Sequence, residues 1–284
     1  MSKKPSSLLT AAIESATPQF VKDFIRNRQF ENTMNKSDNT TDEVEDLTET
    51  ISWLDGNNHR FGALVHNVLT PQECQTLMDR SEQVGYEQAL VNVGGGRQVA
   101  IGEVRNNDRC IIDDPDYAEM LYQRLLLKLQ DHPNVLGPML NWKHLDKQYA
   151  VGLNERLRIL RYDPGTYFAP HSDGYYVRRN EAGPSRRGET SRVTLLLYLN
   201  EGYQGGNTRM LRTFNPSSKG RDIVPRAGSV LLFEHECLHE GVTLEKGRKY
   251  VVRTDLMYSE KGPGNEYSKG LYQDKQPAQG APDR

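Results

Sequence analysis

The chain has 284 residues and a formal net charge of −2, with 36% hydrophobic and 26% charged residues. This length fits one large domain or two small ones, and the near-neutral charge gives no indication of nucleic-acid binding. No apolar run approaches the length of a membrane span, and the apolar stretch near the N-terminus is too short for a secretory signal. The three cysteines lack C-x-x-C spacing, which favours free thiols in a reducing compartment, so we expect a cytoplasmic or nuclear protein.

Composition divides the chain into an ordered part and two flexible ends. Residues 35–50 hold six acidic residues and almost nothing apolar, so we predict a solvated linker within a largely flexible N-terminal extension over residues 1–50. The ordered domain is predicted over residues 51–258, and its C-terminal part over about 155–258 is rich in strand patterns. The tail over residues 259–284 is rich in Gly, Pro, Lys and Gln and is predicted to be flexible.

The first part of the domain contains a strand pattern and two helix patterns. "FGALVHNVL" predicts a strand, and a helix-start signal follows it, with Thr70 as N-cap, Pro71 at the first helical position and Glu73 completing a capping box. The segment 91–109 suggests two strands around a glycine turn, which lacks the Lys-Ser/Thr of a phosphate loop. Apolar residues at helical spacing predict a second helix over residues 114–130.

From Glu155 onward the apolar period becomes that of strands. Short strand patterns separated by Gly, Pro, Asn and Ser occupy residues 156–162, 167–171, 191–200, 207–214, 228–235 and 249–258. We therefore predict an antiparallel β-sandwich or barrel that is preceded by two supporting helices.

The stretch "YDPGTYFAPHSDG" places His171 two residues before Asp173. Residues two apart in an extended strand point the same way, so both side chains can reach one ion. Further along, "LLFEHECLHEG" supplies His235 and His239, and strand parity alone does not choose between them. Two histidines and one carboxylate form the facial triad that suits non-haem Fe(II). The alternative is a polar turn in which Asp173 caps the backbone.

Two basic residues follow in "KGRKYVVRTDLMY". On a strand, Lys249 and Arg253 lie on the same face, and a cation that points into a β-barrel core is costly unless an anion pairs with it. A dicarboxylate such as 2-oxoglutarate would meet that need. The alternative is an edge strand whose basic residues face water.

Five ordered motifs between about residues 156 and 258 resemble the Fe(II)/2-oxoglutarate-dependent dioxygenases, specifically their prolyl 4-hydroxylase-like branch. These motifs are "YDPGTYFAPHSD", "SRVTLLLYLN", "GGNT", "GSVLLFEHECLHEG" and a basic residue ten positions after His239. The resemblance covers about a third of the chain. It implies an α+β fold with a double-stranded β-helix (jelly-roll, cupin-like) core of antiparallel strands and supporting helices packed on one side. It implies that His171, Asp173 and His239 are the iron ligands and catalytic residues, because "LHEG" favours His239 over His235.

The resemblance also implies a co-substrate site. Lys249 would pair with the distal carboxylate of 2-oxoglutarate, while Tyr162 and Tyr198 match positions that often hydrogen-bond the co-substrate. Arg253 departs from the family pattern, in which a small polar residue is commoner. The choice between Lys249, Arg253 or both as the partner of the carboxylate therefore stays open.

The implied activity is hydroxylation of an unactivated C–H bond, with Fe(II), 2-oxoglutarate and O2, release of succinate and CO2, and ascorbate as a candidate reductant. The presence of Asp173 argues against the related halogenases, which have a small residue there. Protein proline is the best-known substrate of the branch, and a small amino acid or another metabolite is the alternative. The remoter alternatives are a zinc hydrolase on the same ligands and a catalytically silent jelly-roll binding module.

The sequence says little about the substrate beyond its class, a protein or peptide or a small molecule, and nothing about the oligomeric state. No membrane partner is expected. The polar loop Tyr175–Ser191 directly follows the first two ligand candidates, and we expect it to act as a lid. It contains four arginines, which either attract an acidic substrate or keep the loop soluble: Arg178, Arg179, Arg186 and Arg187.

Overall fold

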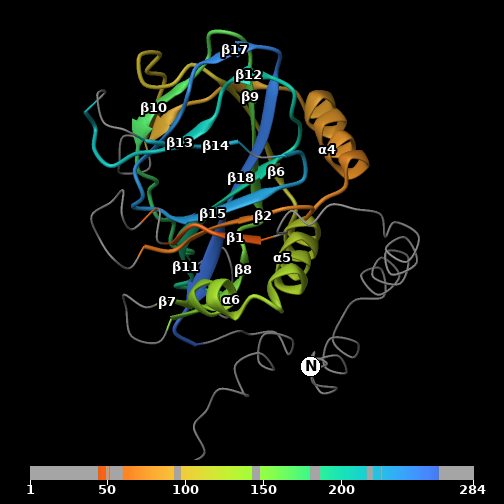
Figure 1. Cartoon of the computed structure of the whole chain (residues 1–284), viewed down its shortest axis with the longest axis vertical. Helices are drawn as coiled ribbons and strands as arrows, with labels where there is room; N and C mark the ends of the chain where they lie inside the picture. Colours follow the sequence, from red (N-terminus) through yellow and green to blue (C-terminus); the bar gives the residue numbers. More distant parts are fainter. Residues whose placement is uncertain are drawn as a thin grey trace, which may run out of the picture.

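The strand patterns of the C-terminal half form two antiparallel sheets that face each other (Figure 1). The computed structural model describes residues 44–48, 51, 60–92, 97–142, 148–179, 186–215, 220–224 and 226–261. Most of the predicted N-terminal extension, the glycine turn over residues 94–96 and the tail after residue 261 lie outside the described residues. The domain boundaries therefore remain predictions.

The larger sheet has ten strands. Its order is β1 (Val44–Asp46), β2 (Gly62–Val65), β15 (Val230–Glu234), β11 (Thr190–Tyr198), β18 (Lys249–Ser259), β9 (Arg156–Tyr162), β6 (Asp108–Asp113) and β3 (Glu87–Gln88). Two further strands complete it, with β8 (Gln148–Leu153) beside β18 and β7 (Asn141–Trp142) beside β8. Long apolar strands such as β11 lie at its centre because both of their faces are buried.

The smaller sheet has the order β10 (Phe168–His171), β16 (His239–Gly241), β13 (Thr208–Met210) and β14 (Arg221–Ile223). Short ribbons join β12 (Gln204–Gly205) to β17 (Leu244–Lys246) and β4 (Val91–Asn92) to β5 (Gln98–Val99). Strands β9, β11, β15 and β18 of the larger sheet and the four strands of the smaller sheet make the eight-stranded pattern of a jelly roll. The predicted fold class is confirmed.

Three helices accompany the sheets among the described residues: α4 (Pro71–Val84), α5 (Pro115–Leu129) and α6 (Pro133–Leu140). The predicted start of α4 is confirmed, because the Thr70 side chain accepts from the Glu73 N–H and the Glu73 carboxylate accepts from the Thr70 N–H in a capping box. Helix α6 was not predicted. It has only eight residues and contains Pro138, so it has little helical periodicity to recognise.

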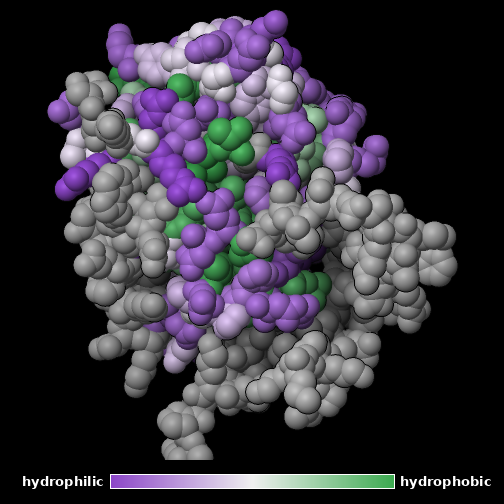
Figure 2. All heavy atoms as spheres, in the orientation of Figure 1, coloured by the Kyte–Doolittle hydropathy of each residue, from purple (hydrophilic) through white to green (hydrophobic). Residues whose placement is uncertain are grey.

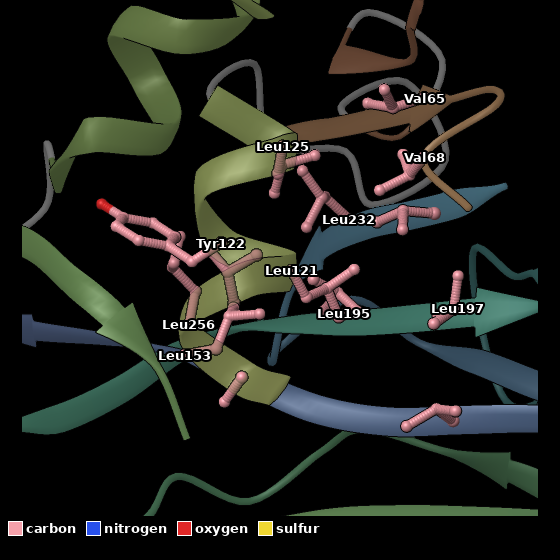
Figure 3. Packing of buried hydrophobic residues seen from close by; sticks show 14 of the residues in the cluster. Val65, Val68, Leu121, Tyr122, Leu125, Leu153, Leu195, Leu197, Leu232 and Leu256 are labelled. Carbon is pink, nitrogen blue, oxygen red and sulfur yellow. The ribbon is translucent and has the colours of Figure 1, made fainter. Parts of the chain in front are cut away.

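Alternate residues of the central strands serve two different cores. On β11, Leu195 and Leu197 face the helices and pack with Leu121 and Leu125 of α5 (Figure 3). The residues between them, such as Leu196, face the smaller sheet and belong to a second cluster. This alternation follows from the two-residue period of a strand. The helices thus support one face of the larger sheet and leave the other face to build a site.

The predicted solvated linker over residues 35–50 is wrong at its C-terminal end. Residues Val44–Asp46 form the edge strand β1, antiparallel to β2, and Leu47 is buried against the smaller sheet's side of the core. Two apolar side chains in an acidic segment suffice here because the edge of a sheet supplies the missing hydrogen bonds.

The side of the molecule seen in Figure 2 is largely hydrophilic, with apolar side chains in small separate patches. No helix among the described residues has both the length and the apolar character required to cross a bilayer.

Candidate active site

Neighbouring strands of the smaller sheet bring His171 and His239 together, with ring centres 4.2 Å apart. His171 ends β10 and His239 begins β16, and these residues are cross-strand partners in the smaller sheet. Asp173 lies just beyond the end of β10, where its N–H donates to the carbonyl of His235 at 2.8 Å. One ligand atom from each of His171, Asp173 and His239 lies within 4.8 Å of the others. The H-x-D pair therefore meets a histidine that is distant in the sequence.

Backbone carbonyls orient both imidazoles. Nδ1 of His171 lies 2.8 Å from the carbonyl oxygen of Ala169, and Nδ1 of His239 lies 3.0 Å from that of Cys237. An Nδ1–H that donates to a carbonyl leaves the lone pair of Nε2 free for a metal. Each Nε2 lies 3.9 Å from a carboxylate oxygen of Asp173. Burial lowers the pKa of His239 and lowers that of His171 to about 3, so both rings are neutral at physiological pH.

Asp173 is held as a carboxylate. Burial raises its pKa, but Arg253 and the neighbouring histidines outweigh burial and hold the pKa well below its usual range. Nη2 of Arg253 lies 3.1 Å from Oδ1 of Asp173. The hydroxyl of Thr194, on the inward face of β11, donates to Oδ2 at 2.5 Å. Both carboxylate oxygens therefore have a partner that limits their rotation.

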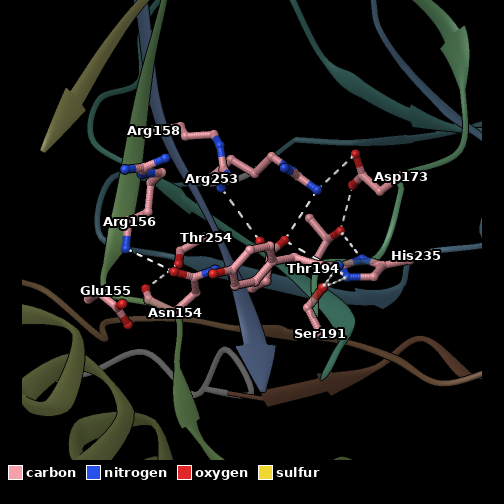
Figure 4. Close-up of polar contacts among 12 residues, drawn as sticks. Asn154, Glu155, Arg156, Arg158, Asp173, Ser191, Thr194, His235, Arg253 and Thr254 are labelled. Carbon is pink, nitrogen blue, oxygen red and sulfur yellow. Dashed lines mark hydrogen bonds and ion pairs between the residues drawn. The ribbon is translucent and has the colours of Figure 1, made fainter. Parts of the chain in front are cut away.

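His235 lies behind this cluster and is only 4% exposed. Its Nδ1 is 2.8 Å from the Thr194 hydroxyl, and its Nε2 is 2.9 Å from the Ser191 hydroxyl (Figure 4). His235 follows β15 of the larger sheet, whereas His239 belongs to the smaller sheet, because the chain turns between them. Strand parity could not separate the two histidines for this reason.

Lys249 is a buried cation that lacks an anion. Its side chain is 2% exposed, and its Nζ donates to the carbonyl of Gly206 at 2.5 Å. The rings of Tyr162, Tyr198 and Tyr203 surround it, with centroids 5.2, 5.5 and 6.0 Å from Nζ. No carboxylate of the described residues lies within ion-pair distance. Burial alone lowers the pKa of Lys249 to about 7.

Arg253 faces the same interior but is paired. Besides Asp173, its Nη2 contacts Oδ1 of Asp255 at 3.2 Å. Figure 4 shows the Arg253 side chain pointing toward Asp173. The two basic residues that the sequence left equivalent therefore differ: Lys249 can receive an anion, and Arg253 already holds one.

One cavity of about 1050 Å³ connects these groups. Lys249 and Tyr162 line it together with His171, Asp173 and His239. Tyr198, the other tyrosine predicted to contact the co-substrate, does not line it. Its hydroxyl lies 2.7 Å from that of Thr208 and is buried behind the cavity wall.

The site fits the metal and the co-substrate that the sequence implies. Two neutral imidazoles and one carboxylate, converging on the same point, are the donor set of non-haem Fe(II). The uncompensated ammonium of Lys249, in the same cavity, is suited to a carboxylate. A dicarboxylate that reached both the metal and Lys249 would satisfy each.

The loop predicted to be a lid is anchored at its base. Residues Val177 and Thr190 form a β-bridge, and Arg178 is 2% exposed between Glu155 and Glu189, with which it forms ion pairs. Arg178 is therefore a structural residue and neither of the two predicted roles applies to it. The tip over residues 180–185 lies outside the described part of the chain.

Sequence reasoning missed three residues that line this cavity, Asp255, Arg105 and Arg158, and also Thr194, which supports Asp173 from behind. Thr194 and Arg158 carried a signal, since each is a polar residue that shares strand parity with inward-facing apolar neighbours. Arg105 lies outside regular strands and carried none.

Residues 157–254 match the family model described as the 2OG-Fe(II) oxygenase superfamily. This segment contains all three metal-ligand candidates together with Lys249 and Arg253. No curated protein shows significant sequence similarity to the chain.

Among solved structures, similar ones include a viral collagen prolyl hydroxylase from Paramecium bursaria Chlorella virus-1, in complex with 2OG, at 19% identity and a TM-score of 0.44. It covers 69% of this chain and 95% of that one. A prolyl-4-hydroxylase from Pseudomonas putida has the same identity and TM-score, and the match covers 72% of this chain and 97% of that one. A Trichoplax adhaerens prolyl hydroxylase, in complex with a hypoxia inducible factor peptide fragment, has 15% identity and a TM-score of 0.48, and covers 90% and 97%.

Proposed function

Because residues 157–254 form a domain of the 2OG-Fe(II) oxygenase superfamily, we propose that the protein is an Fe(II)- and 2-oxoglutarate-dependent hydroxylase that inserts oxygen into a C–H bond of its substrate. In this proposal His171, Asp173 and His239 bind the iron, and Lys249 binds the distal carboxylate of 2-oxoglutarate. The observation that carries it is the uncompensated buried Lys249, in the same cavity as a converging His–Asp–His cluster.

Iron and 2-oxoglutarate, when bound, supply the oxidation: one atom of O2 ends in succinate, the other in the hydroxylated product, and CO2 is released. The protein's own residues orient and protect. The carbonyls of Ala169 and Cys237 keep Nε2 of each histidine available. Arg253 and Thr194 hold the Asp173 carboxylate ionised and oriented. The tyrosines around Lys249 exclude water, which strengthens its attraction for a carboxylate.

A peptide or protein substrate, as in the prolyl 4-hydroxylase-like branch, and a small amino acid or metabolite both fit this mechanism. Ascorbate would serve as a reductant that restores iron after unproductive cycles. A zinc hydrolase could use the same three ligands, but it would leave the buried charge of Lys249 without a purpose.

The test is succinate release by the full-length protein, loaded with Fe(II) without oxygen and then exposed to O2 and 2-oxoglutarate. We expect slow succinate formation without substrate, which increases when a pool of peptides or metabolites contains the substrate. Mass spectrometry of that pool should show a gain of one oxygen. If Fe(II) supports no succinate formation while Zn(II) supports hydrolysis in the same pools, the zinc-hydrolase alternative replaces the proposal.

A further inference from the structure

The cavity continues beyond the His171–Asp173–His239 cluster into a region lined by arginines. The inward residues of β18 and β9 are cross-strand partners, so Lys249 faces Tyr162, and Val251 faces Leu160. The next inward pair is Arg253 and Arg158. The inward face thus changes from tyrosine and aliphatic side chains near Lys249 to guanidinium groups on the far side of the cluster.

Two arginines of this region have partners that account for their charge. Arg156 makes a two-pronged ion pair with Asp113, with distances of 2.8 and 2.9 Å. Arg109 contacts Glu87 at 3.2 Å and the side-chain oxygen of Gln98 at 3.3 Å. These carboxylates balance the charges of Arg156 and Arg109, although Nε of Arg109 is buried without a hydrogen-bond partner among the described residues.

Arg158 and Arg253 share one carboxylate, that of Asp255. Both depend on Asp255, whose carboxylate lies 3.5 Å from Nη1 of Arg158 and 3.2 Å from Nη2 of Arg253 (Figure 4). Arg253 also contacts Oδ1 of Asp173 at 3.1 Å, whereas Asp255 is the only ion-pair partner of Arg158 among the described residues. Nη1 of Arg158 is buried and has no hydrogen-bond partner among the described residues. Like charges at directly opposed strand positions repel, so this pair holds more positive charge than Asp255 can neutralise.

Arg105 differs from the other arginines of this region because it forms no ion pair with a described residue. It is 9% exposed, yet no carboxylate of the described residues lies within ion-pair distance. Its Nε donates to the side-chain oxygen of Asn107 at 2.7 Å, and its guanidinium carbon lies 4.4 Å from the centre of the Phe168 ring. Its two terminal nitrogens donate to nothing in the described part of the chain. Burial lowers the pKa of Arg105 to about 10, which leaves it charged at neutral pH.

The position of Arg105 relates this charge to the metal site. Phe168 separates the guanidinium from the imidazole of His171, and the centres of the two rings are 3.5 Å apart. Arg105 and Arg158 both line the cavity that contains His171. A cation that is nine-tenths buried is costly unless an anion pairs with it. No side chain in the described part of the chain brings an anion to Arg105 at ion-pair distance, whereas the open cavity has room for one.

We propose that Arg105 and Arg158 bind a carboxylate of the substrate, so that the substrate is a carboxylate-bearing molecule held beside the metal cluster. This proposal rests on the proposed function and narrows its substrate class. The guanidinium group presents paired N–H donors that match the two oxygens of a carboxylate. The carboxylate belongs either to a free amino acid or to the C-terminus of a peptide, and an internal residue of a protein would not provide it.

The test compares acids with their amides. The Fe(II)-loaded full chain is supplied with 2-oxoglutarate, O2 and each proteinogenic L-amino acid, or with its C-terminal amide. In a second arm it receives a random peptide pool with free or with amidated C-termini. Stimulated succinate release and a gain of one oxygen are measured. We expect an acid to stimulate turnover at least ~10-fold more than its amide. The arm in which this difference is seen identifies the source of the carboxylate, a free amino acid or a peptide C-terminus.

The matching variants are Arg105→Gln and Arg158→Gln, with Arg161→Gln as control. Arg161 is on the same strand as Arg158 but on the opposite face, where Glu82 and Asp108 pair with it. Loss of a buried charge partner should lower kcat/KM for the acid by about 100-fold in the first two variants. It should not raise the KM for 2-oxoglutarate, because the proposed function assigns the co-substrate to Lys249 and not to these arginines. The control should retain wild-type kinetics.

Three results would overturn the carboxylate proposal: amides as active as acids, no stimulation by any acid, or a raised KM for 2-oxoglutarate in Arg105→Gln. The last would assign Arg105 to the co-substrate. Failure of the proposed function is recognised separately, because the wild-type chain would then release no succinate from 2-oxoglutarate in any arm. Thermal melting of each variant identifies those that fail to fold. If Arg105→Gln fails to fold, Arg105→Lys, which keeps the charge, is compared with Arg105→Met, which removes it.

Discussion

Arg253 lies 3.1 Å from the carboxylate of Asp173 and points toward the three candidate metal ligands. Lys249 lies on the same face of the same strand but has no such contact. Sequence reasoning could not decide which of the two cations would receive the co-substrate. Their contacts differ in a way that separates two functions, support of a metal ligand and capture of an anion.

Arg253→Gln is expected to weaken iron binding. The substitution removes the charge that keeps Asp173 ionised and oriented, and loss of such supporting contacts typically lowers metal affinity by about 10–100-fold. The KM for 2-oxoglutarate, measured at saturating iron, should not change. Iron titration of the apo protein checks this, with Arg161→Gln as the matched control. A raised KM with unchanged iron affinity would instead make Arg253 a co-substrate residue.

Lys249→Ala is expected to raise the KM for 2-oxoglutarate by about tenfold or more, since removing one partner of a buried charge pair costs roughly 2–5 kcal/mol. Iron affinity should change little because Lys249 is not one of the three candidate ligands. Lys246→Ala is the control, because Lys246 is exposed on β17. Steady-state kinetics in 2-oxoglutarate provide the measurement, and equal KM values for the two variants would contradict the assignment.

Binding of 2-oxoglutarate should weaken as pH rises above 7. Burial lowers the pKa of Lys249 to about 7, and the carboxylate binds the charged amine. Below this pKa the amine is already protonated and binding is strongest. Above it, a proton must be taken up with the ligand, so the affinity falls about tenfold per pH unit. Calorimetric titration of the iron-loaded protein without oxygen, from pH 6 to pH 9, measures this.

Lys249→Arg serves as the control for the pH dependence. Arginine stays charged throughout this range. The affinity of the Lys249→Arg variant for 2-oxoglutarate, whatever its value, should therefore stay constant from pH 6 to pH 9. If wild type and Lys249→Arg weakened in parallel, another group would be responsible.

His239→Ala is expected to abolish succinate formation, whereas His235→Ala should retain most of it. Only His239 lies in the cluster of ligand atoms, and His235 acts on Asp173 through Thr194. Iron content after dialysis and succinate release are measured on both variants. The reverse outcome would identify His235 as the third ligand.

Leu125→Ala is expected to destabilise the fold by about 2–5 kcal/mol because it leaves a cavity between α5 and the larger sheet. Gln130→Ala, at the exposed end of the same helix, should change stability by no more than about 0.5 kcal/mol. Urea unfolding followed by circular dichroism compares the two. A similar midpoint for both would mean that α5 contributes little to the folded state.

The sequence by itself determined the local structure and half of the site. The capping box of α4, the two-faced pattern of β11 and the H-x-D pair all follow from interactions between near neighbours, so periodicity and motif spacing were sufficient to predict them. The edge strand β1 and helix α6 escaped prediction because their formation depends on the larger structure against which they pack.

Only the tertiary structure decided which distant groups meet. His239 rather than His235 joins His171 because the chain crosses from the larger sheet to the smaller one between them. Lys249 and Arg253 have the same parity on one strand, yet Asp173 reaches only Arg253. Arg105 lay in no recognisable sequence pattern, and only the packing shows that its charge is buried with no carboxylate of the described residues at ion-pair distance. Parity determines the face of a strand on which a side chain lies, but the charges opposite that face come from segments brought there by long-range packing.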